Sequence, residues 1–109
     1  MIARVWHGRT DVARADEYTK YLQQTGVTDL RRIPGNRGVL VLCDRSGSEA
    51  KFTLISFWDS VDAIRKFAGE DVLKARYYPQ DRDFLRELEP HVQHLDVAVT
   101  EGPLFNPRG

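Results

Sequence analysis

Histidine is the residue type in this chain best suited to acid–base chemistry, because its side chain titrates near neutral pH. The sequence holds three histidines, at positions 7, 91 and 94. His7 ends an apolar run, and we take it as the first candidate for a general base. His91 and His94 are three residues apart in an expected strand, so their side chains point to opposite faces and cannot bind one ion. We therefore predict no metal site.

Two adjacent tyrosines form the second candidate group. Tyr77 and Tyr78 stand directly before Pro79, where a helical segment is expected to end. Their rings could offer a stacking surface and hydrogen-bond donors to a ligand, or they could pack as a loop that closes the helix. Tyr18 and Phe67 lie at apolar helix positions and would line a pocket that faces the helices. The sequence has no phosphate-loop or dinucleotide-binding glycine pattern.

Hydrophobic spacing predicts the elements that must position these residues. The expected strands are residues 2–7, 39–44, 51–58 and 91–99, and the expected helices are residues 13–22, 61–68 and 81–88, with a further turn at 72–76. Residues 26–32 either prolong the first helix or form a short one of their own. Ser60 is typical of a helix N-cap and Gly69 of a C-cap. This order predicts an α+β, ferredoxin-like β-α-β-β-α-β domain with an antiparallel sheet.

Size and composition limit the classes of protein to consider. A chain of 109 residues with 41% hydrophobic and 29% charged residues fits one globular domain, which we expect at residues 1–99 before an irregular tail at 100–109. A formal net charge of zero argues against general nucleic-acid or membrane-surface binding. Cys43 is the single cysteine, which fits a reducing compartment. Charged residues interrupt the first apolar residues, so we expect no signal peptide and a cytoplasmic protein.

Both faces of the expected strands carry apolar residues. In the first strand, Ala3, Val5 and His7 share one face, and Ile2, Arg4 and Trp6 share the other. Two helices can cover only one face of a small sheet, so we expect the face that carries Trp6 to remain uncovered. A two-fold dimer that packs sheet against sheet would bury it, and a homodimer is the partner we predict.

The joint between the third strand and the second long helix resembles a known family. Residues 55 to 69 read Ile-Ser-Phe-Trp-Asp-Ser-Val-Asp-Ala-Ile-Arg-Lys-Phe-Ala-Gly, which is similar to that joint in the antibiotic biosynthesis monooxygenase family. Through element order the resemblance covers roughly residues 1 to 99, and it implies a dimeric α+β barrel. Members include cofactor-independent oxygenases of aromatic, quinol-like compounds, haem-degrading oxygenases and many proteins without an established activity.

The resemblance also implies a pocket between the sheet and the helices. There His7 would remove a phenolic proton, and Tyr77 and Tyr78 would sit at the pocket mouth. His7 could also meet His94 or His91 across neighbouring strands, which would keep one imidazole neutral. Haem-degrading relatives carry an Asn near the end of the first strand, a Trp in the second helix and a His after it. The corresponding positions here hold His7, Phe67 and Tyr77, and tyrosine can ligate haem iron.

Three functions therefore stay open. The first is a small monooxygenase that needs no cofactor, acts on an aromatic, quinol-like molecule and uses His7 and Tyr77 as catalytic residues, with Tyr18, Phe67, Tyr78 and His94 binding the ligand. The second is a protein that binds haem or another planar ligand. The third is a non-catalytic dimeric domain, which would have a filled interior without a pocket between sheet and helices.

Overall fold

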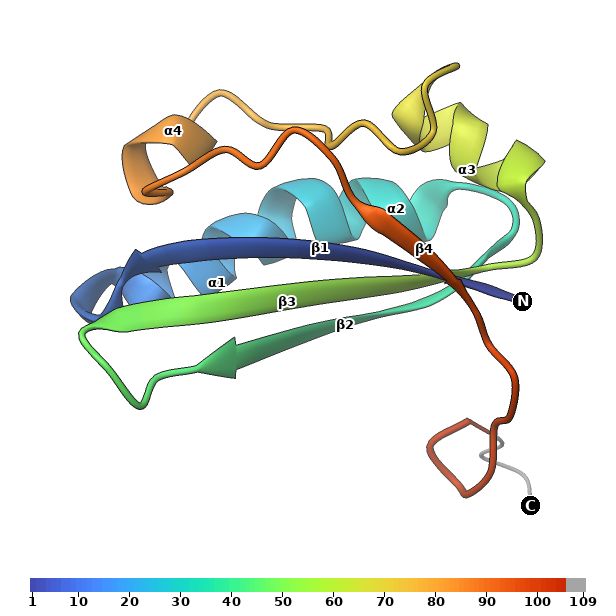
Figure 1. The fold of residues 1–109 in the computed structure, drawn as a ribbon, viewed down its shortest axis with the longest axis horizontal. Coiled ribbons are helices and arrows are strands. Elements are labelled where there is room, and N and C mark those ends of the chain that lie inside the picture. Colours follow the sequence, from blue (N-terminus) through green and yellow to red (C-terminus); the bar gives the residue numbers. More distant parts are fainter. Residues whose placement is uncertain (106–109) are drawn as a thin grey trace.

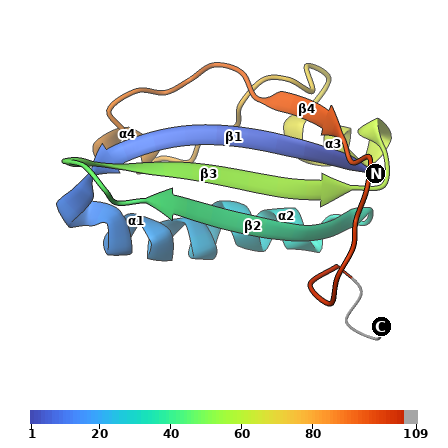
Figure 2. The ribbon, with the colours of Figure 1, turned by 60° about the horizontal axis from the view of Figure 1, so that its bottom comes forward.

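A computed structural model of the chain describes residues 1–105. Four antiparallel strands form one sheet in the order β2-β3-β1-β4, and the helices lie on one side of it (Figures 1 and 2). This is the α+β, ferredoxin-like fold that the sequence predicts, and the prediction is confirmed. Among the described helices, none combines the length and the apolar character needed to cross a lipid bilayer.

The first and third strands extend further toward the hairpin than expected, the second begins earlier, and the fourth is shorter at both ends. They are β1 (Ile2–Asp11), β2 (Asn36–Asp44), β3 (Glu49–Trp58) and β4 (Gln93–Asp96). β1 pairs with β3 along its whole length, from Ile2 opposite Trp58 to Asp11 opposite Glu49. β4 pairs only with the start of β1, where Arg4 lies opposite His94.

The chain that connects β1 to β2 forms one helical run, and this run covers the sheet. It begins with a 3₁₀ turn (Val12–Arg14), continues as α1 (Ala15–Leu22) and a π-helical turn (Gln23–Val27), and ends as α2 (Thr28–Arg32). The carboxylate of Asp11 caps its start by accepting a hydrogen bond of 2.9 Å from the backbone N–H of Ala13. The sequence before Pro34 thus prolongs the first helix, which was one of the two expected outcomes.

The second long helix, α3 (Val61–Ala68), follows its local signals. The hydroxyl of Ser60 accepts a hydrogen bond from the backbone N–H of Ala63 at 3.2 Å. Gly69 ends the helix with a φ of 87°, a conformation that glycine adopts without strain. The predicted N-cap and C-cap are both confirmed.

The segment between α3 and β4 differs from the prediction. The helical turn expected at residues 72–76 does not form, and α4 is a single turn (Asp81–Phe84) that stops before Leu88. The backbone of residues 72–76 bonds to residues 90–92 instead, with Ala75 N–H donating to Pro90 O at 2.8 Å and Val92 N–H to Leu73 O at 2.8 Å. These long-range bonds satisfy the backbone in place of helical ones.

The core lies between the sheet and the helices. Its largest fully buried side chains are Trp58, Tyr18, Phe52 and Ile64. Trp6 also packs against this core, so the prediction that it lies on the uncovered face is wrong. Its ring passes so close to Gly8 that a Cβ there would stand 2.3 Å from the indole. Both faces of β1 carry apolar residues, so the pattern did not show which one the helices cover. The uncovered face is the one that carries Ala3, Val5 and His7.

The uncovered sheet face, which we call the open face, carries the other residues of each strand. The register aligns Val5, Ile55 and Leu40 across three strands, and likewise His7, Thr53 and Leu42. The C-terminal segment runs to this side of the sheet (Figure 1), where the ring of Phe105 meets that of Phe57 edge-on at 6.5 Å.

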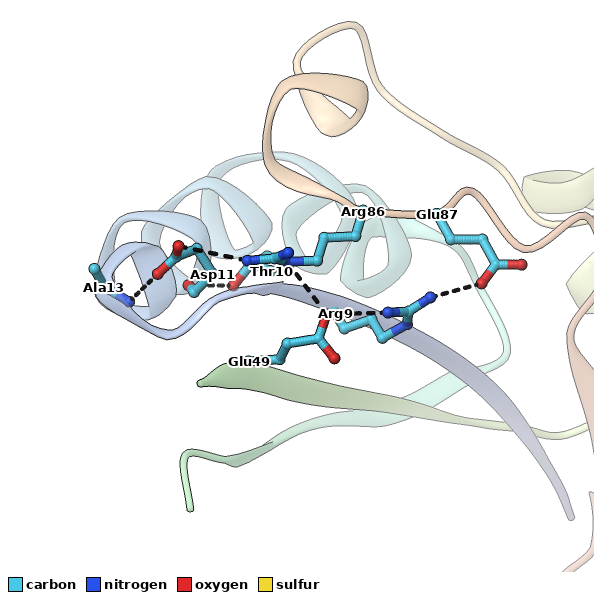
Figure 3. A network of polar contacts seen from close by, with 7 residues as sticks. All are labelled: Arg9, Thr10, Asp11, Ala13, Glu49, Arg86 and Glu87. Atoms are coloured by element: carbon cyan, nitrogen blue, oxygen red, sulfur yellow. Dashed lines mark hydrogen bonds and ion pairs between the residues drawn. The ribbon is translucent and has the colours of Figure 1, made fainter. Parts of the chain in front are cut away.

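A surface network holds the end of β1 to the segment after α4 (Figure 3). The guanidinium of Arg9 pairs with Glu49 and with Glu87, each at 3.0 Å, and Arg86 pairs with Glu49 at 3.2 Å and with Asp11 at 3.4 Å. Exposed ion pairs contribute little singly, but the network also includes the backbone bond from Arg86 N–H to Arg9 O at 3.0 Å. The network thus holds residues 86 and 87, which follow α4, against the end of β1.

Candidate functional site

An apolar cleft lies between the helix-covered face of the sheet and the segments packed above it. Its floor comes from β1 and β3, as Arg4, Trp6, Leu54 and Ser56. One wall comes from the helical run, as Tyr18, Leu22, Gly26 and Leu30. The other comes from α3 and the segment after it, as Phe67, Arg76, Tyr78, Asp81 and Val92. The space that a water-sized molecule can reach is about 50 Å³, so a ring-shaped ligand requires side chains at the rim to move.

A buried tyrosine–carboxylate pair stands at one end of the cleft. The hydroxyl of Tyr18 donates to Asp81 Oδ1 at 2.9 Å, and the backbone N–H of Tyr78 donates to Asp81 Oδ2 at 2.6 Å. Burial raises the pKa of the Asp81 carboxyl, although both hydrogen bonds act to lower it. Burial, followed by the charge of Asp81, raises the pKa of Tyr18, which stays a neutral donor.

The rim of the cleft is formed by stacked side chains. The Arg76 guanidinium lies over the ring of Phe67 at 4.8 Å and over the ring of Tyr78 at 5.3 Å. The hydroxyl of Tyr78 donates to Asp29 Oδ2 at 2.6 Å, and burial, with this hydrogen bond, raises its pKa. Arg76 is exposed at this rim, where its guanidinium also donates to Phe67 O at 3.3 Å and lies 4.0 Å from Asp29 Oδ2.

Tyr77 lies next to the cleft rather than in its lining. Its hydroxyl accepts a hydrogen bond of 3.1 Å from Trp6 Nε1 and donates one of 2.5 Å to Glu89 O. The two rings meet edge-on with centroids 6.2 Å apart. Burial raises the pKa of Tyr77 as well. Tyr77 therefore supports the position of Trp6 on the cleft floor.

Arg4 is a buried cation on the cleft floor, with 4% of its surface exposed. Its guanidinium donates to Val72 O, to Lys74 O at 3.0 Å and to Nε2 of His94 at 3.1 Å. Burial lowers its pKa to about 10. Burial, and then the charge of Arg4, lowers the pKa of His94, so this imidazole is neutral and accepts at Nε2.

The structure places His7 on the open face, away from the cleft. Its Nδ1 lies 3.3 Å from the hydroxyl of Thr53, and the side chain is exposed. The expected contact between His7 and His94 does not form. β4 pairs with β1 only from Ile2 to Val5, and His94 lies opposite Arg4, whose side chain is on the other face from that of His7.

Three of the six predicted site residues thus line one cleft, namely Tyr18, Phe67 and Tyr78. Tyr77 and His94 lie beside it through Trp6 and Arg4, and His7 is separate. The sequence analysis missed Arg4 and Asp81 as site residues. An arginine between two apolar residues of a strand was the available signal for Arg4. Within residues 1–105, His, Cys, Asp and Glu side chains form no group of three suited to a metal ion.

Comparison with known proteins shows a similarity of fold alone. No protein-family model matches the sequence, and no curated protein matches it. Among solved structures, a haem-degrading protein from Mycobacterium tuberculosis, MhuD, solved with two haems bound in its active site, has a TM-score of 0.62 and 16% sequence identity. The similarity covers 94% of this chain and 100% of that chain.

Proposed function

We propose that this chain binds a planar aromatic small molecule in the cleft between the sheet and the helices. The observation that carries the proposal is the apolar cleft, whose floor and walls include Trp6, Tyr18 and Phe67. Such lining suits the faces of a ring system. The similarity of fold to MhuD makes haem the first ligand to test.

The lining fits a porphyrin ring better than it fits iron. Leucine and aromatic side chains suit the faces of the macrocycle, but among the described lining residues none is a histidine, cysteine or methionine. The hydroxyls of Tyr18 and Tyr78 already donate to carboxylates, and their raised pKa values oppose ligation as tyrosinate. We therefore derive no reaction step through iron, and we expect recognition of the ring itself.

Gly26 offers a variant that narrows the cleft. It lies in the π-helical turn, and π-helical turns often occur at functional sites. A Cβ at Gly26 would meet only the ring of Tyr78, at an ordinary contact distance of 3.7 Å. Gly26→Leu would project a larger side chain into the cleft, and Gly26→Ala is its matched control.

The test is a titration of wild type and both variants with haem, protoporphyrin IX and 2-naphthol. We expect haem and protoporphyrin IX to bind with affinities within about a factor of three, because no lining residue coordinates iron. Gly26→Leu should weaken each interaction by about tenfold or more, while Gly26→Ala binds as wild type does. The proposal fails if none of the three probes binds, or if Gly26→Leu leaves binding unchanged.

Oxygenation of a bound quinol is a second candidate, and one observation favours it. Asp81 is a carboxylate in the cleft lining whose pKa is raised by burial, and perturbed groups in clefts often do chemistry. It would take the role of base that the sequence assigned to His7. The overall reaction would be quinol plus O₂ to hydroxyquinone plus water: the quinol is the reductant, one oxygen atom enters the ring, and the other leaves as water with the two hydrogens lost on oxidation to the quinone. Oxygen uptake with a quinol that persists in Asp81→Asn would remove this assignment.

We propose further that the chain forms a homodimer through the open face, as a member of the dimeric α+β barrels. The partly exposed Ile55 and Leu40 support this, together with Leu42 and Leu95, which are 50% and 48% exposed. An isologous contact between two such faces would bury them.

A further inference from the structure

Arg4 is a buried charge without a counter-ion. Within residues 1–105 its guanidinium makes no ion pair, and its recorded partners are two backbone carbonyls and a neutral imidazole. The arginines that do form ion pairs with carboxylates lie at the surface, and their side chains are at least 39% exposed. A buried, unpaired cation is costly to a fold, so a compensating gain is expected elsewhere.

We propose that Arg4 receives the carboxylate of an aromatic acid bound in the cleft. This inference rests on the proposed function and adds the chemical class of the ligand. Arg4 is part of the cleft floor, so a group that enters the cleft can reach it. A carboxylate there would supply the missing negative charge in an apolar setting, where charge-assisted hydrogen bonds are strong.

The guanidinium is held in place and keeps donors for a ligand. The bonds to Val72 O and Lys74 O anchor it to the segment after α3, and the bond to His94 anchors it to β4. A guanidinium has five N–H donors in a planar fork, and these three bonds do not use them all. A fixed fork with unused donors suits a carboxylate, whose two oxygens can accept in parallel.

The neighbouring ring indicates how the rest of the ligand lies. The Arg4 guanidinium is 6.0 Å from the centroid of the Phe67 ring, and Arg76 stands over the same ring at 4.8 Å from the rim side. An aromatic ring stacked near Phe67 would therefore present a carboxylate on its edge to Arg4. The ring of the ligand would supply apolar contact area with the cleft, and its carboxylate would fix the orientation of the ligand.

A merely structural role for Arg4 makes a different prediction. If Arg4 serves only to tie residues 72–74 and His94 to the sheet, its removal should lower stability and should affect charged and neutral ligands alike. If it serves a ligand, Arg4→Met should discriminate between them. Methionine has a similar length and no charge. Arg4→Met removes the buried charge but also the donors to Val72 O and Lys74 O, so the preference between the ligands, rather than the unfolding temperature, separates the two roles.

The experiment compares naphthalene-2-carboxylate with naphthalene-2-carboxamide by calorimetric titration. The two probes share the ring and differ in charge. We expect wild type to bind the carboxylate about tenfold or more tightly than the amide, which corresponds to one charge-assisted interaction. Arg4→Met should bind the two equally, and Arg4→Lys, which keeps the charge, should retain part of the preference. Arg65→Met is the matched control, because it removes an exposed arginine of α3 that does not line the cleft, and it should retain all of the preference.

The outcomes separate the two proposals. Equal binding of both probes by wild type overturns the assignment of Arg4 and leaves the aromatic cleft standing. A preference for the carboxylate that survives in Arg4→Met, or that disappears equally in Arg65→Met, also overturns it. Binding of neither probe, nor of haem, protoporphyrin IX or 2-naphthol, overturns the proposed function with it. Should Arg4→Met fail to fold, the wild-type comparison and Arg4→Lys decide the matter.

Discussion

Two buried charged side chains, Arg4 and Asp81, line the cleft, and they differ in the partners that the chain provides for them. Asp81 accepts from the Tyr18 hydroxyl and from the backbone of Tyr78, so its carboxylate is compensated by donors of the chain itself. Arg4 has carbonyl and imidazole acceptors but no anion among the described residues. A buried charge without a counter-ion is costly to the fold, and the proposed ligand carboxylate would offset that cost at Arg4.

His94 should make stability depend on pH. Its folded pKa is lowered from the ordinary value of 6.5, because burial and Arg4 disfavour the charged imidazole. The unfolded chain then binds more protons, so the free energy of unfolding is highest above pH 6.5 and falls as the pH drops toward the folded pKa. Urea unfolding at several pH values measures this, and His94→Asn should remove the fall.

His91 provides the control for this pH effect. Its side chain is exposed, so His91→Asn should leave the pH dependence of wild type unchanged. An equal reduction of the pH dependence in His91→Asn and His94→Asn would contradict the role given to the Arg4–His94 contact.

At the scale of elements, the sequence predicts well where signals are local. The cap of α3 by Ser60, its end at Gly69 and the β2–β3 hairpin depend on neighbouring residues, and all three are present. The segment 69–92 was mispredicted because its backbone bonds to residues far along the chain, such as Ala75 to Pro90. Arg76, Asp81 and Val92 line the cleft from that segment, so this wall of the candidate site could not be read from the sequence.

The face of β1 illustrates a second limit. Alternation shows that Trp6 and His7 lie on opposite faces, but it does not show which face the helices cover. Gly8 held a clue, since a glycine two residues from a tryptophan leaves room for the indole on the same face. The structure uses that room, with Trp6 folded over Gly8.

Substitution of Gly8 should therefore disturb β1 more than an ordinary glycine would. A Cβ at Gly8 would lie 2.3 Å from the Trp6 indole and 3.0 Å from Leu85, so Gly8→Ala forces the ring out of its place. We expect a loss of about 1–3 kcal/mol in the free energy of unfolding, measured in urea. Gly47→Ala is the control, because its Cβ meets nothing closer than 4.0 Å. Equal effects of the two substitutions would refute the packing argument.

The whole molecule has one sheet face covered by helices and one that the described chain covers only in part. Phe105 of the C-terminal segment reaches Phe57, but Leu42 and Leu95 remain about half exposed. Sequence analysis predicted an uncovered apolar face correctly and assigned the wrong residues of β1 to it. The error leaves the reason for a dimer unchanged, because both faces of β1 and β3 carry apolar side chains.

The homodimer yields the prediction at this scale. Analytical ultracentrifugation of the full chain should show twice the monomer mass of 12.5 kDa. Leu42→Glu should raise the dimer dissociation constant by about tenfold or more, because an isologous interface places the new charge on both sides and removes apolar contact area twice. Leu73→Glu alters a leucine of similar exposure, 43% against 50%, away from the strands, and should leave the dimer intact. A monomeric wild type, or equal weakening by both variants, would show that the open face does not join two copies, and the partial cover by Phe105 would then be the state in which the molecule works.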